Sequence, residues 1–337
     1  MVAAVNPFFG GAFRGRIVSI EPQTGSASTI RFETNRPSGG RRAGQFVTIG
    51  VEVDGVRHHR CYSLTSIPSD DVLEITVQAI DDGTVSWHLV HHARLGDIVQ
   101  LGEPGGDFTL PDEHVPMLCL TGGSGITPVM AMLRELDRRT PSRDASDVIV
   151  VHHVTTRDRL IFAAELAELD HRCEWLTVRL VVMDEGGRHL DPEQLDQYCP
   201  DWRDREVFVC GPLALREAAL DICVTSGDVS KVHVESFTPL SRATSRPTSP
   251  TETILGSVLL SRSCREIEVA PGSTLLDALE AHGMAPPSGC RMGICHTCVT
   301  ALTSGCVTDV RDGRVIEAGT HVQLCVTTTV DHVTLDI

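Results

Sequence analysis

Residues 118–128 read Leu-Cys-Leu-Thr-Gly-Gly-Ser-Gly-Ile-Thr-Pro, an apolar run that passes through a glycine-rich turn into residues that favour a helix start. A helix that follows such a turn directly offers free N–H groups and the positive end of its dipole to a pyrophosphate. We expect Thr127 to be the N-cap and Pro128 to take the first helical position. The ordinary Gly-x-Gly-x-x-Gly dinucleotide fingerprint is absent here, so a tight turn without a ligand is the alternative interpretation.

Apolar runs alternate with amphipathic stretches after this turn, up to about residue 238. Strands are expected over 117–121, 148–154, 177–182, 206–210 and 232–235, and helices over 128–138, 162–169 and 214–226. Alternation of this kind is typical of a parallel sheet covered by helices. It predicts a doubly wound α/β domain over residues 115–238.

The residues before the turn have a different texture, with short β-rich runs separated by turn residues. Strands are expected over 16–20, 29–33, 45–51, 72–79 and 97–101. Several short strands at this spacing favour an antiparallel barrel. We therefore expect a β-barrel domain over residues 1–114.

The last part of the chain begins with a segment rich in Pro, Ser and Thr, residues 239–251, which is expected to be a linker because it has no apolar periodicity. A small domain over 252–337 follows. It contains Cys290, Cys295, Cys298 and Cys325 in the pattern Cys-x4-Cys-x2-Cys…Cys, the ligand spacing of plant-type 2Fe-2S ferredoxins. A structural zinc site, the alternative, usually has two Cys-x2-Cys pairs, and only one is present.

Length, charge and composition limit the remaining possibilities. A chain of 337 residues suits two or three domains. Its net charge of −16 argues against nucleic acid as a partner. There is no apolar run long enough to span a bilayer, and no secretory signal in residues 1–11, so the cytoplasm is the default location. The 12 cysteines are then interpreted as thiols or metal ligands rather than disulfides.

Two further motifs lie in the expected barrel. Residues 60–66, interpreted as following a strand, read Arg-Cys-Tyr-Ser-Leu-Thr-Ser, and residues 83–89 read Gly-Thr-Val-Ser-Trp-His-Leu. With these motifs the chain resembles the ferredoxin–NADP reductase superfamily, whose flavin motif is Arg-x-Tyr-Ser-x-x-Ser/Thr followed by Gly-x-x-Ser-x-x-Leu. The resemblance covers almost the whole chain, in the order flavin barrel, nucleotide domain, linker and C-terminal ferredoxin domain. It implies a multidomain protein whose last domain is an α+β (β-grasp) ferredoxin.

The resemblance assigns a flavin site to the barrel, for FAD or, alternatively, FMN. Arg60 would neutralise a flavin phosphate, Tyr62 would pack on the isoalloxazine ring, and Ser63 would form a hydrogen bond near N5. Ser86 would cap a helix whose N-terminus faces the phosphate. The other motif residues expected at the flavin are Leu64, Gly83 and Val85.

The resemblance also assigns a nicotinamide site. Its pyrophosphate turn comprises Thr121, Gly122, Gly123, Gly125, Thr127 and Pro128. The run Cys210, Gly211 and Pro212 would lie beside the nicotinamide, while Glu235 and Phe237 would lie at the flavin, Phe237 moving aside for hydride transfer. Arg157 and Arg159 favour NADPH, but Asp158 stands between them and keeps NADH as the alternative. The catalytic set is thus Ser63, Cys210, Glu235 and Phe237.

These assignments imply an electron-transfer enzyme. Hydride would pass from NADPH to the flavin, which can release electrons singly to the cluster and then to a separate terminal enzyme. Residues 290–295 and 305–313 are similar to actinobacterial NADPH oxidoreductases that serve acyl-CoA desaturases. A Rieske oxygenase, a cytochrome P450 and an alkane hydroxylase are alternative acceptors. A redox sensor or carrier is the non-enzymatic alternative, and a flavin reductase that releases free reduced flavin is another.

The charge of the ferredoxin domain suggests how the acceptor is recognised. Acidic residues outnumber arginines in residues 252–337, so we expect a basic docking surface on the acceptor. If the acceptor is a membrane enzyme, the contact would be transient. Cys264 and Cys306 are expected to be buried apolar residues rather than ligands. The pairs His58, His59 and His91, His92 are expected at the surface rather than at a metal.

Overall fold

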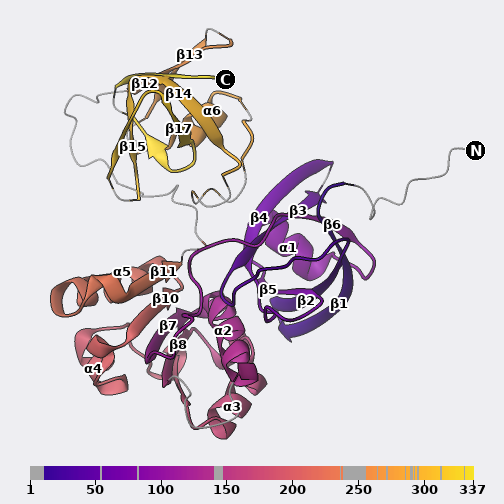
Figure 1. Ribbon diagram of the computed structural model, residues 1–337, viewed down its shortest axis with the longest axis vertical. Helices are drawn as coiled ribbons and strands as arrows, with labels where there is room; N and C mark the ends of the chain where they lie inside the picture. The colour runs from indigo at the N-terminus through magenta and orange to yellow at the C-terminus, as the bar shows by residue number, and fades with distance from the viewer. Residues whose placement is uncertain are drawn as a thin grey trace, which may run out of the picture. The chain divides into compact units, whose positions relative to one another are not determined.

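The computed structural model describes residues 11–53, 55–81, 83–139, 147–235, 237, 256–263, 265–270, 272–284, 286–288, 291, 293, 296–311, 313–329 and 331–337 (Figure 1). Contacts divide the chain into two compact units, Met1–Phe237 and Thr238–Ile337. The predicted linker lies outside the described residues. In the described part of the chain, no helix is long and apolar enough to cross a bilayer.

The first half of unit one is an antiparallel sheet of six strands, in the order β4-β3-β6-β1-β2-β5. Its strands are β1 (Arg14–Thr24), β2 (Ala27–Thr34), β3 (Phe46–Val53), β4 (Val56–Ser63), β5 (Leu73–Gln78) and β6 (Ile98–Leu101). A bridge between Leu64, directly after β4, and Ile75 of β5 joins the two edges of the sheet. The sheet therefore closes into the predicted barrel, around a core that includes Ile17, Ile30 and Phe32.

Strand β4 corrects one expectation, because the motif at residues 60–63 lies within a strand and not after one. The polar run Arg57 to Arg60 has no apolar alternation that would reveal a strand. Its pairing comes from β3, with Arg60 opposite Ile49 and Tyr62 opposite Val47. The neighbouring strand, and not local sequence, decides this element.

Helix α1 (Thr84–His91) covers the barrel and corrects a second expectation. Its N-cap is Gly83, without a side-chain hydrogen bond, so Ser86 is not the cap. Ser86 Oγ instead donates to the Gly83 carbonyl at 3.3 Å. A Cβ on Gly83 would lie 2.3 Å from both Ile80 Cγ1 and Ser86 Oγ, so a side chain at this turn would displace Ile80 or Ser86.

The second half of unit one is a parallel sheet of five strands, in the order β11-β10-β7-β8-β9. Its strands are β7 (Met117–Gly122), β8 (Val148–Val154), β9 (Leu176–Val182), β10 (Glu206–Cys210) and β11 (Val232–Glu235). The helices are α2 (Ile126–Arg139), α3 (Ala163–Arg172), α4 (Pro192–Tyr198) and α5 (Leu213–Ser226). Strands β8, β10 and β11 have the bounds expected from sequence. Helix α4 was not expected, since only Leu195 is a buried apolar residue within its seven residues.

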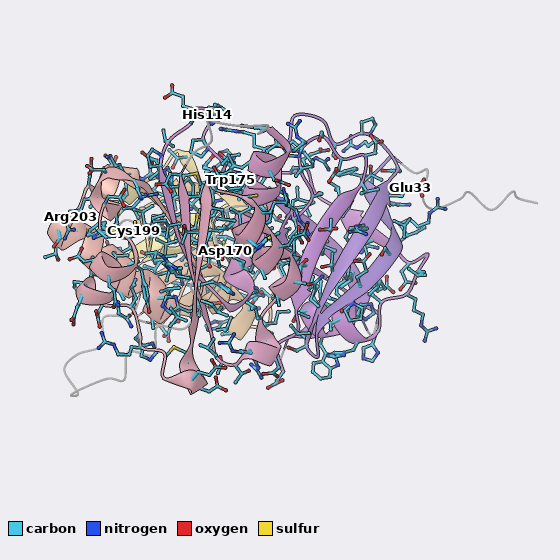
Figure 2. The ribbon with its side chains drawn as sticks, turned by 90° about the horizontal axis from the view of Figure 1, so that it is seen from below. Glu33, His114, Asp170, Trp175, Cys199 and Arg203 are labelled. Atoms are coloured by element: carbon cyan, nitrogen blue, oxygen red, sulfur yellow. The ribbon has the colours of Figure 1, made fainter. Side chains whose placement is uncertain are left out.

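Two apolar cores lie on the two faces of this sheet. Helices α2 and α3 cover one core, and α4 and α5 cover the other (Figure 1). Cys199 after α4 belongs to the second core, whereas Trp175 before β9 packs against the first (Figure 2). The domain is therefore doubly wound, as predicted. Its strand order reverses beside β7, where such folds bind ligands at the carboxyl ends of the strands.

Helix α2 starts two residues earlier than expected, which corrects the assignment of Thr127 as N-cap. A single 3-10 turn, Gly123–Gly125, leads directly into Ile126. Thr127 is therefore inside the helix, and its Oγ1 donates to the Ser124 carbonyl at 2.9 Å. The glycines, and not a capping side chain, make the tight transition from strand to helix.

Unit two has the β-grasp arrangement expected of a plant-type ferredoxin. Its main sheet has the order β13-β12-β19-β14-β17, with β12 parallel to β19, and α6 (Leu275–Ala281) contributes Leu275 and Leu279 to the core. The strands of this sheet are β12 (Gly256–Leu260), β13 (Arg265–Val269), β14 (Val299–Ser304), β17 (Thr320–Gln323) and β19 (His332–Leu335). A smaller sheet contains β15 (Cys306–Asp309), β16 (Val315–Glu317) and β18 (Thr327–Thr328).

Candidate active site and iron-sulfur site

Two glycine-containing turns meet at the carboxyl edge of the parallel sheet. A Cβ on Gly125 would lie 2.1 Å from the Cys210 carbonyl oxygen, and one on Gly211 would lie 2.9 Å from the Gly122 nitrogen. Gly123 has a φ of +53°, in the left-handed region that favours glycine. Glycine at these positions lets the turn after β7 approach the turn after β10, so the two predicted nucleotide motifs form one site.

A cavity of about 450 Å³ lies beside these turns. Of the predicted residues, Gly122, Gly123, Arg159 and Pro212 line it. Its place at the carboxyl ends of β7 and β8 is where a doubly wound sheet binds a dinucleotide. The residues present thus fit a nicotinamide nucleotide, with backbone N–H groups at the glycine turn for its pyrophosphate.

The two predicted arginines of this site differ in their partners. Arg157 donates from Nε and Nη2 to the carboxylate oxygens of Glu185, at 2.6 and 2.8 Å. Its charge is therefore balanced within the protein. Arg159 has no such ion pair in the described part of the chain and lines the cavity. Only Arg159 is thus available to a negatively charged ligand there.

Sequence reasoning missed the histidines of this cavity, His153 and His189. His153 ends the apolar strand β8, and its Nδ1 lies 3.4 Å from the Thr121 carbonyl oxygen. Burial lowers the pKa of His153, which keeps its ring neutral at pH 7. No local pattern indicates these positions, because only the fold brings His189, from the loop after β9, to the same cavity.

The predicted catalytic residues of barrel and sheet come together where the two halves of unit one meet. Ser63 at the end of β4 donates from Oγ to Glu235 Oε2 at 3.3 Å. Glu235 ends β11 and stands beside Cys210 in the parallel register. All three residues are buried. Phe237 is half-buried against the core of the α/β domain, and its place over the flavin stays a prediction.

Burial dominates the acid-base properties of this group. It raises the pKa of Glu235 to about 8, although the hydrogen bond from Ser63 opposes the shift. It also raises the pKa of the Cys210 thiol, with the Glu235 charge as a further cause. At pH 7 Glu235 is therefore mainly protonated and Cys210 is a thiol.

The flavin-motif residues occupy two places in the barrel. Tyr62 packs against the barrel core, where burial raises the pKa of its phenol, and Leu64 is fully inside. Gly83 lines a second cavity, of about 650 Å³, at the start of α1. Val85 instead points into the core, and Arg60 Nη1 donates to the His59 carbonyl at 2.7 Å. The N-terminus of α1 is of the kind that binds a phosphate, but Glu52 and Asp81 also line this cavity, so the place of the flavin stays a prediction.

The histidines of the barrel form no metal site among the described residues, where no three metal-binding side chains gather. His92 lines the second cavity and is exposed together with His91, as expected. His58 and His59 are half-buried on β4, so the expectation of surface residues holds only in part for them. The partial burial of His59 follows from its position over Gly50. A Cβ built on Gly50 would lie 2.7 Å from His59 Nε2.

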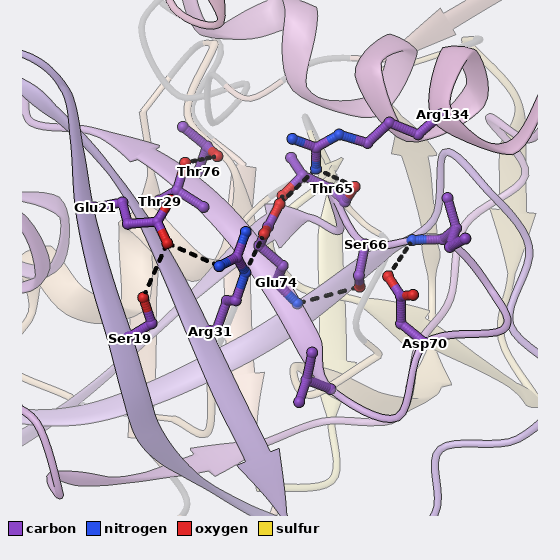
Figure 3. Close-up of polar contacts among 12 residues, drawn as sticks. Ser19, Glu21, Thr29, Arg31, Thr65, Ser66, Asp70, Glu74, Thr76 and Arg134 are labelled. Carbon is purple, nitrogen blue, oxygen red and sulfur yellow. Dashed lines mark hydrogen bonds and ion pairs between the residues drawn. The ribbon is translucent and has the colours of Figure 1, made fainter. Parts of the chain in front are cut away.

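A charged cluster that sequence reasoning missed joins the barrel to the α/β domain (Figure 3). Glu74 on β5 is buried and accepts hydrogen bonds from Thr65 Oγ1 at 2.7 Å, Arg31 Nε at 2.7 Å and Arg134 Nη1 at 2.5 Å. Arg134 comes from α2 and also binds the carboxylate of Glu165 on α3, at 2.7 Å from both Nε and Nη2. Through Arg134, this cluster links β5 of the barrel to α2 and α3 of the α/β domain.

Two of the four predicted cluster ligands are described in unit two. The sulfur atoms of Cys298 and Cys325 lie 3.3 Å apart, and both residues are buried. Two thiolates this close fit one iron of a 2Fe-2S cluster. Cys290 and Cys295, and also Cys264, lie outside the described residues. Cys306 was expected to be buried, but it is only half-buried, and its sulfur lies 3.9 Å from Asp331 Oδ2.

Comparisons with known proteins agree with this geometry. Three domain families match in chain order: an oxidoreductase FAD-binding domain over residues 15–110, an oxidoreductase NAD-binding domain over 118–221, and a 2Fe-2S iron-sulfur cluster binding domain over 258–329. The fold and the site therefore define an NAD(P)H-dependent oxidoreductase that uses FAD and a 2Fe-2S cluster.

Similar proteins and a similar solved structure identify the family of this enzyme. An NADPH oxidoreductase of Mycobacterium tuberculosis is 39% identical, over 98% of this chain and 86% of the relative. The glycine betaine monooxygenase reductase subunit of Chromohalobacter salexigens is 30% identical, over 97% and 95%. The solved structure of phthalate dioxygenase reductase superposes with a TM-score of 0.66 at 25% identity, over 97% and 98%. The chain belongs to the ferredoxin–NADP reductase superfamily, in the class that carries a C-terminal 2Fe-2S ferredoxin domain.

Proposed function

We propose that this reductase takes electrons from NADPH and delivers them singly to a separate terminal enzyme, an acyl desaturase. The meeting of Ser63, Cys210 and Glu235 beside the nucleotide cavity carries the first half of this proposal. Bound FAD supplies the exchange between a two-electron donor and a one-electron acceptor. The predicted domain boundaries and a location in the cytoplasm remain part of the proposal.

Each residue of this group has a definable task. The glycine turns at Gly122 and Gly211 admit the nucleotide close to the backbone. The hydroxyl of Ser63 forms a hydrogen bond to the flavin, with Glu235 holding a proton beside it at neutral pH. Cys210, a buried thiol, and Phe237 shape the space that the nicotinamide enters. Arg60 and Tyr62 bind the phosphate and ring of the flavin.

Selectivity for NADPH rests on Arg159. Its guanidinium lines the cavity, whereas the charge of Arg157 is balanced by Glu185. We therefore expect Arg159→Ala to raise the KM for NADPH about tenfold or more while leaving that for NADH nearly unchanged. Arg157→Ala is the matched control and should change neither. Equal effects of the two substitutions would mean that Arg159 does not read the 2′-phosphate.

An anaerobic titration with NADPH, and separately with NADH, tests the electron path. Following the visible spectrum and the electron paramagnetic resonance signal, we expect FAD and cluster bands to bleach and a rhombic signal of reduced 2Fe-2S to grow. Cys298→Ser should retain reduction of ferricyanide and lose reduction of cytochrome c. A protein that carries zinc, or that neither nucleotide reduces, would instead be a sensor or carrier.

The acceptor is tested by reconstitution. The desaturase proposal is supported by the resemblance at residues 290–295 and 305–313, and the expected partner presents a basic surface to the acidic ferredoxin domain. A monooxygenase is the second candidate, because one relative is named as the reductase subunit of such an enzyme. NADPH-dependent product formation by vesicles that contain an acyl-CoA desaturase would support the first candidate. Turnover only with a soluble Rieske oxygenase would support the second.

A further inference from the structure

One short turn in unit two contacts both segments that carry the predicted cluster ligands. Arg311 Nη1 donates to the carbonyl of Gly293 at 3.2 Å, and Gly293 lies between Cys290 and Cys295 in the sequence. The neighbouring Val310 donates its N–H to the Val326 carbonyl at 2.9 Å, one residue after Cys325. The turn after β15 therefore connects the cluster loop to the strand region of the fourth ligand.

A buried carboxylate orients the guanidinium of Arg311. Asp309 accepts from Arg311 Nε at 2.9 Å and from Nη2 at 2.6 Å, and its Oδ1 also accepts from the Arg311 backbone N–H at 3.0 Å. Asp309 is 1% exposed. The hydrogen bond from Arg311 lowers the pKa of Asp309, so this carboxylate is ionised at neutral pH. A two-point contact of this kind fixes the plane of the guanidinium, which a lysine cannot reproduce.

The Gly293 carbonyl is held from a second side by Gln323. Gln323 Nε2 donates to this carbonyl at 2.7 Å and lies 3.2 Å from Nδ1 of His296, which is also in the cluster loop. Gly293 has a φ of +74°, and a Cβ there would lie 2.5 Å from Arg311 Nη1. Gly293 thus lies close against Arg311, and its positive φ favours glycine at this position.

An exposed ion pair in the same unit shows what an ordinary surface contact looks like. Arg262 binds Asp336 through Nε and Nη2, both at 3.0 Å. Its side chain is 70% exposed and that of Asp336 is 43% exposed, whereas the side chain of Asp309 is 2% exposed. Arg311 differs in two ways, because its carboxylate is buried and its remaining N–H groups reach the cluster loop. Arg262→Gln is therefore a matched control.

We propose that Arg311, oriented by Asp309, is a positioning residue for the 2Fe-2S cluster. It anchors the loop that carries Cys290 and Cys295, and its charge, balanced by Asp309, contributes to the reduction potential of the cluster. Charge and hydrogen bonding near a cluster are among the factors that set this potential. The inference rests on the assignment of Cys290, Cys295, Cys298 and Cys325 as ligands.

The test compares Arg311→Gln, Asp309→Asn, the double variant and Arg262→Gln in the full-length protein. Arg311→Gln leaves a buried negative charge, so we expect the midpoint potential of the cluster to fall. Asp309→Asn leaves an unbalanced positive charge, so the potential should rise. The double variant should return close to the wild-type potential, and Arg262→Gln should not shift it. Shifts in the same direction for both single variants would overturn the role of the charges.

Loss of the cluster to an iron chelator reports the anchoring separately. Arg311→Gln and the double variant should lose iron several-fold faster than the wild type, while Arg262→Gln should not. Arg311→Lys keeps the charge without the two-point contact, so it should hold the potential and still lose iron faster. Release at the wild-type rate in Arg311→Lys and Arg311→Gln would overturn the anchoring.

Two controls separate this inference from the function on which it rests. Reduction of ferricyanide by NADPH should stay at the wild-type rate in every variant, because it needs only unit one. A wild-type protein that holds no 2Fe-2S cluster would overturn the ligand assignment itself. If Arg311→Gln does not retain a cluster on purification, Asp309→Asn and Arg311→Lys still provide the measurements of potential and release.

Discussion

Two buried glutamates lie where the barrel meets the α/β domain, and their surroundings are opposite. Glu74 is surrounded by Arg31, Arg134 and Thr65, whereas Glu235 has Ser63 as its hydrogen-bond partner among the described residues. Burial alone would raise the pKa of both. The arginines and Thr65 overcome this at Glu74 and lower its pKa, while the pKa of Glu235 rises to about 8.

This difference gives the two glutamates different roles: Glu74 is an ionised group that stabilises the structure, and Glu235 is a protonated group in the proposed active site. A buried carboxylate with two cationic partners stays ionised and fixes the elements that supply them, here α2 and β2. A buried carboxylate without a cation keeps its proton near neutral pH, and it can form a hydrogen bond with a neighbouring hydroxyl. The same side chain thus joins the domains at one point and serves the proposed site at another.

The largest expected effect on stability comes from removing one of the two arginines that balance the charge of Glu74. Arg134→Ala should lower the free energy of unfolding of unit one by about 4 kcal/mol, because it leaves Glu74 buried with one partner removed. Since the pKa of Glu74 is lowered in the folded state, its stabilisation exists above the unfolded pKa and is lost as the pH falls through the folded value. The loss in Arg134→Ala should therefore shrink in acid. Denaturant unfolding at pH 7 and pH 3 measures both effects.

Arg172→Ala is the control for this substitution. Arg172 also makes a two-point contact with a carboxylate, that of Asp137, but Asp137 is 31% exposed and Arg172 46%, whereas Glu74 is buried. It should cost far less, and comparable losses in the two variants would contradict the role given to burial.

At Glu235, which has no cationic partner among the described residues, we expect a substitution to stabilise the protein rather than to destabilise it. Glu235 has a raised pKa in the folded state, so between pH 4.5 and about 8 the folded protein holds a proton that the unfolded chain has released, and stability falls as pH rises. Glu235→Gln removes this cost and should stabilise the protein by on the order of 3 kcal/mol at pH 9, with little effect at pH 4. Thermal unfolding across this range measures it. Destabilisation at pH 9 would show that Glu235 has a cationic partner when FAD is bound.

The rate of FAD reduction by NADPH should depend on the same proton. When Glu235 ionises, the hydrogen bond that its carboxylate accepts from the Ser63 hydroxyl becomes stronger, so this hydroxyl is less available to the flavin. We expect the rate in stopped-flow measurements to fall about tenfold above pH 8, the value of one hydrogen bond to a charged group. Glu235→Gln should give a flat profile close to the rate of the wild type at pH 7. A wild-type rate independent of pH from 6 to 10 would disprove the assignment.

The smallest effect is expected at Arg31, the exposed partner of Glu74. Its side chain is 40% exposed, against 22% for Arg134. Arg31→Gln should therefore cost less than about 1 kcal/mol, and salt should reduce the cost further. Unfolding at low and high ionic strength tests this. A cost equal to that of Arg134→Ala would mean that the two arginines contribute alike and that burial does not rank them.

Prediction from sequence succeeded where the pattern is local. The strands β8, β10 and β11 follow from short apolar runs, and the turn at Gly122–Gly125 from its glycines. It failed where pairing with a neighbouring strand determines the secondary structure. The polar run in β4, for example, is a strand only because it pairs with β3. It also misplaced two caps, because Thr127 and Ser86 turn their hydroxyls back to carbonyls of the preceding turn.

The sequence by itself indicated the domain types, a nucleotide site and the 2Fe-2S cluster, because the glycine turn and the cysteine spacing bring their residues together over short distances along the chain. It left FMN open beside FAD, and NADH beside NADPH. The tertiary structure decided which of these residues act together. Arg157 and Arg159 look alike in the sequence, but only one is balanced by Glu185. Glu74 and Glu235 differ only in what the fold places around them, since burial and charge compensation depend on residues distant along the chain.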